Sequence, residues 1–243
     1  MCRHLAAIDH PSAGDLLFDA PHALCDQART PKHQPVGRTN PDGWGVAWYP
    51  PAAPTGSGPE HYRTVARIWD DHEFVTTARA IECRTLIAAA RLASPGLVLA
   101  AESNAPFVAG PWAFSLNGFA DGFGGDAGVA LHDALSPARR AALVSDTDSE
   151  VLFALVLDRI DAGAAARDAL ASVMHHVTGI TTGRINLLLT DGDAVHATRW
   201  GNSLFTRGPV VASEPLDDTD DWLEIADRSL VTLDAHGTRI EAL

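Results

Sequence analysis

Basic residues are scarce in this sequence of 243 residues, where 18 lysines and arginines stand against 31 aspartates and glutamates for a formal net charge of -13. Nucleic-acid-binding surfaces gather lysine and arginine to neutralise phosphates, so a chain of this charge is poorly suited to them. Long apolar runs are missing too, because no stretch approaches the roughly 20 consecutive apolar residues that span a bilayer. We therefore expect neither a nucleic acid nor a membrane as partner.

Cysteine is also rare, with Cys2, Cys25 and Cys83 as the three residues of this type. An odd number of widely spaced cysteines is typical neither of a disulfide framework nor of a CxxC metal site. The first ten residues include Arg3 and His4 where a secretory signal has an apolar core. The sequence thus predicts a cytoplasmic protein in which Cys25 and Cys83 are plain thiols.

Recognisable metal and nucleotide motifs are absent from the sequence. The 11 histidines are scattered and form no HExxH, and the neighbours His175 and His176 would point about 100° apart on a helix. Neither GxxxxGK[ST] nor GxGxxG occurs. We therefore expect no metal and no cofactor.

The order of the expected elements indicates an α+β fold in a single domain over residues 1–243, without internal repeat or linker. Before the main helices, strands are expected over 3–8, 43–49, 62–69, 85–90 and 112–116. Helices are expected over 73–81, 148–160 and 164–177, and further strands follow from residue 185 to a hairpin around 235–237. Hairpin turns between neighbouring strands favour largely antiparallel sheets. The glycine-dense segment 119–128 is expected to be a mobile loop that can close over Asn117.

Cys2 can become the mature N-terminus once Met1 is trimmed. One residue then carries a thiol with an ordinary pKa near ~8.5 and an α-amine with a pKa of about 7.7 to 8.0, so the amine can accept the thiol proton. By position alone, Cys2 is more simply an ordinary free thiol. The other motifs decide between these two interpretations.

Two further segments have both a structural and a chemical interpretation. Asn117-Gly118 is a favoured turn dipeptide, and its side-chain amide and glycine N–H could also converge on an oxyanion. Arg91 follows an apolar run and can be interpreted simply as a solvated charge at the end of a strand. Alternatively, its guanidinium binds a carboxylate with two hydrogen bonds, and the Ser94 hydroxyl adds a further donor.

The segment 146–150 has a strong structural explanation. Thr147 as N-cap and Glu150 three residues later form the pattern of a capping box before an apolar helix. Asp148 suits the positive end of the helix dipole, but many residues would serve there. Its carboxylate is therefore a candidate to receive a ligand ammonium group.

Taken together, six segments of this chain resemble, in their order, the class II glutamine amidotransferases, which are N-terminal-nucleophile hydrolases. These segments are Met1-Cys2-Arg3-His4-Leu5, Asn40-Pro41-Asp42-Gly43-Trp44-Gly45, Arg91-Leu92-Ala93-Ser94, Asn117-Gly118, Thr147-Asp148-Ser149-Glu150 and Ala212-Ser213-Glu214-Pro215-Leu216. The resemblance implies a four-layer αββα sandwich in which two mainly antiparallel sheets lie between helices.

The resemblance also implies a role for each of the matching residues. Cys2 would be the nucleophile and its freed amine the proton acceptor. Asn117 and Gly118 would form the oxyanion hole. The glutamyl α-carboxylate would bind Arg91 and Ser94, and the α-ammonium would bind Asp148.

Within that family, the opening MCRHLA and the segments Ser103-Asn104-Ala105-Pro106-Phe107 and Phe114-Ser115-Leu116-Asn117-Gly118 are similar to those of the stand-alone γ-glutamyl hydrolases of ergothioneine biosynthesis. This resemblance implies cleavage of γ-glutamyl-cysteinyl hercynine sulfoxide to glutamate and hercynylcysteine sulfoxide. Many class II glutaminases have histidines where this chain has Ala105 and Leu116, and no synthetase domain is present to consume ammonia. Trp44 is a hypothetical wall for the trimethylammonium group of such a substrate. Two alternatives stay open: a glutaminase subunit that supplies ammonia to a separate protein, and a non-catalytic amino-acid-binding domain.

Overall fold

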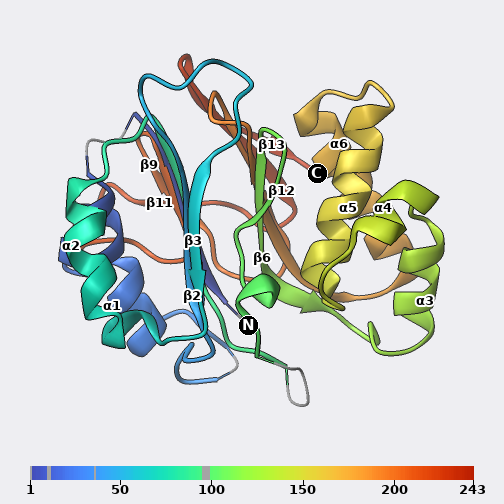
Figure 1. The fold of residues 1–243 in the computed structure, drawn as a ribbon, viewed down its shortest axis with the longest axis horizontal. Helices are drawn as coiled ribbons and strands as arrows, with labels where there is room; N and C mark the ends of the chain where they lie inside the picture. The colour runs from blue at the N-terminus through green and yellow to red at the C-terminus, as the bar shows by residue number, and fades with distance from the viewer. Residues whose placement is uncertain (1, 10–11, 36, 95–98) are drawn as a thin grey trace.

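Two antiparallel sheets lie face to face between two layers of helices (Figure 1). The computed structural model describes residues 2–9, 12–35, 37–94 and 99–243. Every strand pair among these residues runs antiparallel. The α+β class and the four-layer sandwich expected from the sequence are therefore confirmed.

The first sheet has seven strands and contains the N-terminal strand at its centre. Its spatial order is β11 (Leu223–Glu224), β9 (Phe205–Arg207), β10 (Val210–Ala212), β1 (Arg3–Ile8), β4 (Thr85–Ala90), β2 (Trp44–Tyr49) and β3 (Glu60–Thr64). The second sheet has six strands. Its order is β13 (Gly237–Ala242), β12 (Ser229–Asp234), β8 (Val195–Arg199), β7 (Gly183–Thr190), β6 (Trp112–Ala120) and β5 (Phe107–Ala109).

Helices cover the outer face of each sheet (Figure 1). The first sheet carries α1 (Leu24–Arg29) and α2 (His72–Ala80), and the second carries α5 (Asp148–Asp161) and α6 (Ala166–Ile180), with α3 (Asp126–Asp133) and α4 (Pro137–Ala142) beside them. Short helical turns occur at Asp15–Asp19, Ile68–Asp70 and Ala101–Ser103. Among the described residues, no helix is long and apolar enough to cross a membrane.

Side chains of β1 alternate between two apolar layers. Leu5 and Ala7 pack toward the helices that cover the first sheet, whereas Ala6 and Ile8 pack between the two sheets. By the same period of two, Cys2 and His4 lie on the inter-sheet face. Strand β1 thus carries Cys2 into the junction of the two sheets.

Strand β6 alternates in the same way from the other side. Phe114 and Leu116 pack against the helices of the second sheet, while Ala113 packs between the sheets. Ser115 and Asn117 therefore share the inter-sheet face with Ala113. The alternation brings the polar ends of β1 and β6 toward each other.

Several expected elements differ from those observed. The strand expected over 62–69 is β3 up to Thr64, after which a helical turn begins at Ile68. The segment 119–128 is not a single loop: pairing with β7 extends β6 to Ala120, and α3 begins at Asp126. Gly128 lies within α3, where an added Cβ would be 1.8 Å from the Phe123 carbonyl oxygen, so glycine here permits close packing of the turn before the helix.

The predicted capping box forms only in part. Thr147 is the N-cap of α5, and its hydroxyl accepts a hydrogen bond from the Glu150 N–H at 3.3 Å. The Glu150 carboxylate instead accepts from the N–H groups of Val144 and Ser145, at 2.9 and 2.6 Å. Glu150 therefore stabilises the loop before the helix.

Candidate active site

Cys2 and Asn117 meet where β1 of the first sheet faces β6 of the second. The Cys2 nitrogen donates to Asn117 Oδ1 at 3.2 Å, although the two residues are 115 positions apart in the chain. Cys2 is half-buried, and its thiol is free. The structure thus places a potential N-terminal amine against the amide predicted to stabilise an oxyanion.

The other end of the Asn117 amide contacts Ser213, which follows β10. Asn117 Nδ2 donates to Ser213 Oγ at 3.1 Å, and Ser213 Oγ donates to the His4 carbonyl oxygen at 3.1 Å. A carboxamide NH₂ carries two N–H donors. Ser213 occupies one of them, which leaves the second for a ligand oxygen.

Gly118 is required by the close pairing of β6 with β7. Its φ is +139°, and an added Cβ would be 1.7 Å from the Arg184 carbonyl oxygen. A side chain cannot fit at this distance, and the backbone conformation also favours glycine. The turn interpretation of Asn117-Gly118 is wrong, since both residues lie within β6.

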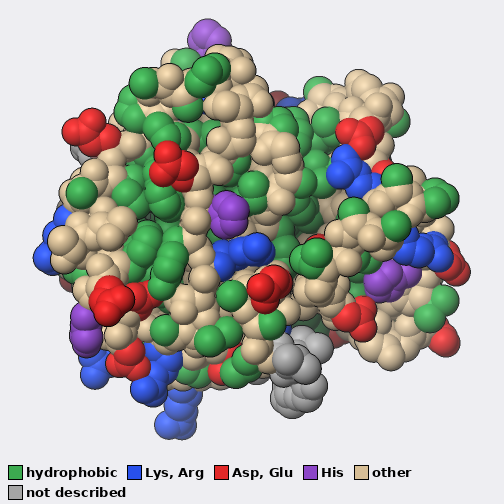
Figure 2. Space-filling view, in the orientation of Figure 1, with side chains coloured by type: hydrophobic (Ala, Val, Ile, Leu, Met, Phe, Trp, Pro, Cys, Tyr) green, Lys and Arg blue, Asp and Glu red, His purple; other side chains and the backbone are tan. Residues whose placement is uncertain are grey.

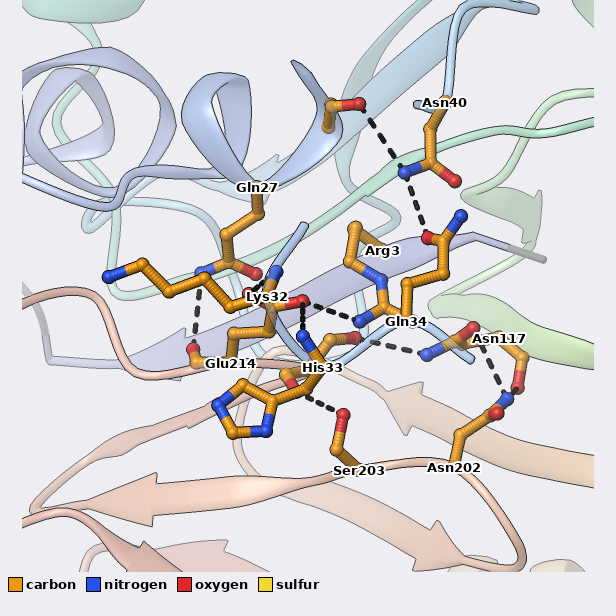
Figure 3. A network of polar contacts seen from close by, with 12 residues as sticks. Arg3, Gln27, Lys32, His33, Gln34, Asn40, Asn117, Asn202, Ser203 and Glu214 are labelled. Atoms are coloured by element: carbon orange, nitrogen blue, oxygen red, sulfur yellow. Dashed lines mark hydrogen bonds and ion pairs between the residues drawn. The ribbon is translucent and has the colours of Figure 1, made fainter. Parts of the chain in front are cut away.

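A buried ion pair fixes the strand that carries Cys2. Arg3 Nη1 lies 2.8 Å from Glu214 Oε1 (Figure 3). Arg3 Nε donates to the Cys2 carbonyl oxygen at 2.8 Å. Glu214 also accepts from the N–H groups of Lys32 and His33. Burial lowers the pKa of Arg3, and the Glu214 carboxylate opposes this shift. Our sequence interpretation assigned no role to this pair.

His4 occupies the next inward position of β1 and is fully buried. Its Nδ1 lies 3.2 Å from Ser115 Oγ. Burial, together with the nearby Arg3 charge, lowers the pKa of His4 to about 3, so the ring is neutral at physiological pH. This neutral ring extends the polar contacts between β1 and β6 inward from Cys2.

Arg91 lies at the same end of the first sheet as Cys2, because β1 pairs with β4 in a register that sets Arg3 opposite Ala90. The residue is 8% exposed, and its Nη1 donates to Asn104 Oδ1 at 3.3 Å. Within the described ranges of the chain, Arg91 makes no ion pair with a carboxylate. The Arg91 guanidinium is therefore hydrogen-bonded to a neutral amide, and its charge can still pair with an acidic ligand.

Asp148 begins α5 and is tied to the end of β6. Its Oδ2 accepts from the Ala120 N–H at 3.0 Å and its Oδ1 from the Ser149 N–H at 2.8 Å. Burial raises the pKa of Asp148, and these hydrogen bonds oppose the shift. The bond to Ala120 places the carboxylate two residues beyond Gly118 along β6.

A cavity of about 660 Å³ adjoins these residues. Its walls come from the end of β6, the glycine-rich turn, α3 and the start of α5, together with Ser94. The lining residues are Ser94, Phe119, Ala120, Gly122, Phe123, Gly124, Gly125, Gly128, Val129, His132, Asp133, Asp146, Thr147 and Asp148. Ser94 and Asp148, predicted separately, therefore share one cavity. Cys2, Asn117 and Arg91 are not among its described lining residues.

Trp44 does not belong to the site. The side chain is fully buried, its Nε1 donates to Asp71 Oδ2 at 3.0 Å, and it packs edge-on against Phe18 and Phe74. The hypothesis that Trp44 walls a trimethylammonium group is wrong, because the apolar layer under α1 and α2 encloses the ring.

No group of three or more His, Cys, Asp or Glu side chains that could hold a metal ion occurs among the residues the structure describes.

Comparison with known proteins places this geometry in a family. Residues 16–206 match the model of "Glutamine amidotransferases class-II". The gamma-glutamyl-hercynylcysteine sulfoxide hydrolase of Mycolicibacterium smegmatis is 34% identical, over 97% of this chain and 97% of that protein. The protein of the same name from Mycobacterium tuberculosis is 32% identical, over 100% and 97%.

Solved structures share the fold. A glutamine aminotransferase class-II domain protein from Silicibacter pomeroyi superimposes with a TM-score of 0.68 at 24% identity, over 99% of both chains. The glutamine phosphoribosylpyrophosphate amidotransferase of B. subtilis superimposes with a TM-score of 0.70 at 16% identity, over 99% of this chain and 49% of that one. With the matched model and the full-length relatives, these likenesses show that the chain belongs to the class II glutamine amidotransferases.

Proposed function

We propose that this protein hydrolyses a γ-glutamyl amide, and that the substrate is γ-glutamyl-cysteinyl hercynine sulfoxide. The observation that carries the proposal is the hydrogen bond from the Cys2 nitrogen to Asn117 Oδ1. It joins the residue that can supply both nucleophile and base to a carboxamide with a spare donor. The substrate is inferred from the full-length relatives, both of which are named for this hydrolysis.

Catalysis begins after removal of Met1, when the Cys2 amine accepts the thiol proton directly or through one water. The thiolate attacks the γ-carbonyl carbon, and the oxygen that becomes negative is stabilised by the Gly118 N–H and the second N–H of Asn117. The protonated amine returns its proton to the leaving nitrogen as the carbon–nitrogen bond breaks. A glutamyl thioester remains on Cys2, and water then attacks it and releases glutamate.

The glutamyl end is recognised by charge. We infer that Arg91 binds the α-carboxylate with help from Ser94, since the guanidinium pairs with no carboxylate in the described parts of the chain. Asp148 binds the α-ammonium, and an ammonium beside it favours the ionised carboxylate that burial alone disfavours. Holding both charged groups sets the scissile amide over the thiol.

The family description favours a second candidate, a glutaminase that releases ammonia for another protein. The two are separated by measuring glutamate release from the conjugate and from glutamine, with the same preparation of mature protein. We expect a kcat/KM for the conjugate that is at least tenfold larger. A larger value for glutamine would overturn the substrate assignment and favour the glutaminase, while cleavage of neither compound would favour a binding domain.

We also propose that the protein acts in the cytoplasm and without nucleic acid. A reducing compartment keeps the Cys2 thiol free for attack. The net charge of -13 repels phosphate, and on the face seen in Figure 2 basic side chains lie among acidic ones.

A further inference from the structure

Asn202 contacts Asn117 from the turn that follows β8. The side chain is 2% exposed, and its Nδ2 donates to the backbone carbonyl oxygen of Asn117 at 2.9 Å (Figure 3). The same nitrogen lies 3.4 Å from Asn117 Oδ1. One amide therefore contacts both oxygens of the residue that faces Cys2.

Asn186 holds Asn202 in this position. Its Oδ1 accepts from the N–H groups of Trp200 and Asn202 at 2.7 and 3.4 Å, and its Nδ2 donates to the carbonyl oxygens of Asn202 and Ser203 at 3.2 and 3.1 Å. On the paired strands, Asn186 lies directly opposite Asn117. Hydrogen bonds through Asn186, Asn202 and Asn117 thus connect β7, the turn after β8 and β6.

The orientation of the Asn117 amide decides whether it can serve the reaction. Its oxygen must face the Cys2 nitrogen, and its NH₂ must face the other way to leave a donor for the oxyanion. Ser213 supports this orientation from one end of the amide, because its hydroxyl donates its one proton to the His4 carbonyl oxygen and can therefore only accept from Asn117 Nδ2. A flipped amide would set NH₂ against the Cys2 nitrogen and an oxygen against the developing negative charge.

Asn202 favours the same orientation from the oxygen end of the Asn117 amide. The backbone carbonyl of Asn117 can only accept, so the NH₂ end of Asn202 must face it. That NH₂ then also lies beside the Asn117 side chain, where it favours the oxygen over a second NH₂. We propose that Asn202 is a positioning residue that fixes the amide orientation of Asn117, an inference that rests on the proposed hydrolysis.

The proposal predicts a specific kinetic change. Asn117 donates to the oxyanion in the transition state only, so misorientation lowers kcat and leaves KM nearly unchanged. Losing one oxyanion donor costs roughly 10² to 10³ in kcat, and a partial misorientation costs part of that. We expect a loss of about tenfold in Asn202→Ala. A larger loss is expected in Asn202→Asp, which has the same shape but places an acceptor against both Asn117 oxygens.

Thr198 provides the matched control. It is fully buried on β8, the strand that leads into the same turn, and its hydroxyl accepts from the Leu187 N–H at 3.0 Å and donates to the Ile185 carbonyl oxygen at 3.3 Å. Thr198→Ala removes a buried polar group of this region without touching Asn117. We expect a lower Tm with wild-type kcat.

The experiment measures kcat and KM for glutamate release from the conjugate, with Tm, in the wild type and the three variants. The proposal is supported if kcat falls most in Asn202→Asp, less in Asn202→Ala and not at all in Thr198→Ala, while KM stays unchanged in all three. Should Asn202→Ala fail to fold, the isosteric Asn202→Asp carries the comparison. Equal kcat in all folded proteins overturns the inference and leaves the proposed function standing. A wild type that cleaves no γ-glutamyl amide refutes the proposed function itself.

Discussion

Arg3 and Glu214 form an ion pair of 2.8 Å in which both side chains are almost completely withdrawn from solvent, at 0% and 3% exposure. The pair joins β1 to the segment after β10, and Arg3 also binds the carbonyl oxygen of Cys2. Breaking such a pair leaves a charge buried without its partner. The pair therefore holds in place β1, the strand that begins next to Cys2.

Replacing Glu214 by alanine therefore destabilises the protein strongly. Removing one partner of a buried ion pair costs about 3–5 kcal/mol, whereas an exposed pair is worth about 0–1 kcal/mol. The free energy of unfolding in urea, measured for the wild type and Glu214→Ala, decides between these ranges. A loss below about 1 kcal/mol would show that Arg3 finds another partner or water.

Gly118→Ala is expected to abolish activity and lower stability, because the new Cβ would be 1.7 Å from the Arg184 carbonyl oxygen. Gly179→Ala is the matched control: this glycine is exposed near the end of α6, and an added Cβ there meets no atom within 4 Å. The control should gain up to about 1 kcal/mol from helix propensity. Thermal melts of both variants test this, and an active Gly118→Ala of wild-type stability would contradict the close approach of β6 to β7.

His4 makes stability fall in acid. The folded state holds the ring neutral with a pKa of about 3, while an unfolded histidine has a pKa near ~6.5. Between these values the unfolded chain binds more protons, so stability is present above pH ~6.5 and is lost as pH falls toward ~3. Well between the two pKa values the loss approaches about 1.4 kcal/mol for each pH unit.

The comparison is between the wild type and His4→Gln, unfolded in urea at pH ~6.5 and ~5.5. The wild type should lose about 1 kcal/mol more than the variant over this interval, because at pH ~6.5 half of the unfolded histidines are already protonated. Parallel pH dependences in the two proteins would mean that His4 is charged or solvated in the folded state.

Asp148→Asn should weaken recognition of the substrate's α-ammonium. A hydrogen bond to a charged group contributes about 1.5–3 kcal/mol, which corresponds to roughly 10- to 100-fold in kcat/KM. The wild type should prefer the γ-glutamyl conjugate over the glutaryl conjugate that lacks the amine, and the variant should lose most of this preference. A preference that survives the substitution would assign the ammonium to another group.

The long elements were predictable because their patterns are local. Strands β1 and β4 were expected at their observed bounds, and α5 within one residue. The short helices α3 and α4 were missed: α3 contains Gly128, a poor helix former, and α4 spans six residues. Their positions depend on packing beside α5, which a local pattern does not contain.

The candidate site was likewise predictable in part, where short motifs carry it. Cys2, Asn117 and Gly118 were identified from motifs, and the structure brings them together. Glu214 and Asn202 received no predicted role, because their partners lie 211 and 85 positions away along the chain. The sequence offered one sign of the Arg3–Glu214 pair, which is that each of these charged residues lies within an otherwise apolar segment.

The central claim is that Cys2 forms a thioester with the glutamyl group. The most direct test is glutamate release from γ-glutamyl-cysteinyl hercynine sulfoxide by the mature wild type and by Cys2→Ala, at equal concentration and with matching Tm values. We predict release by the wild type and a loss of at least roughly 10³-fold in the variant, because no other group replaces a missing nucleophile. A Cys2→Ala protein that releases glutamate at the wild-type rate would contradict the account.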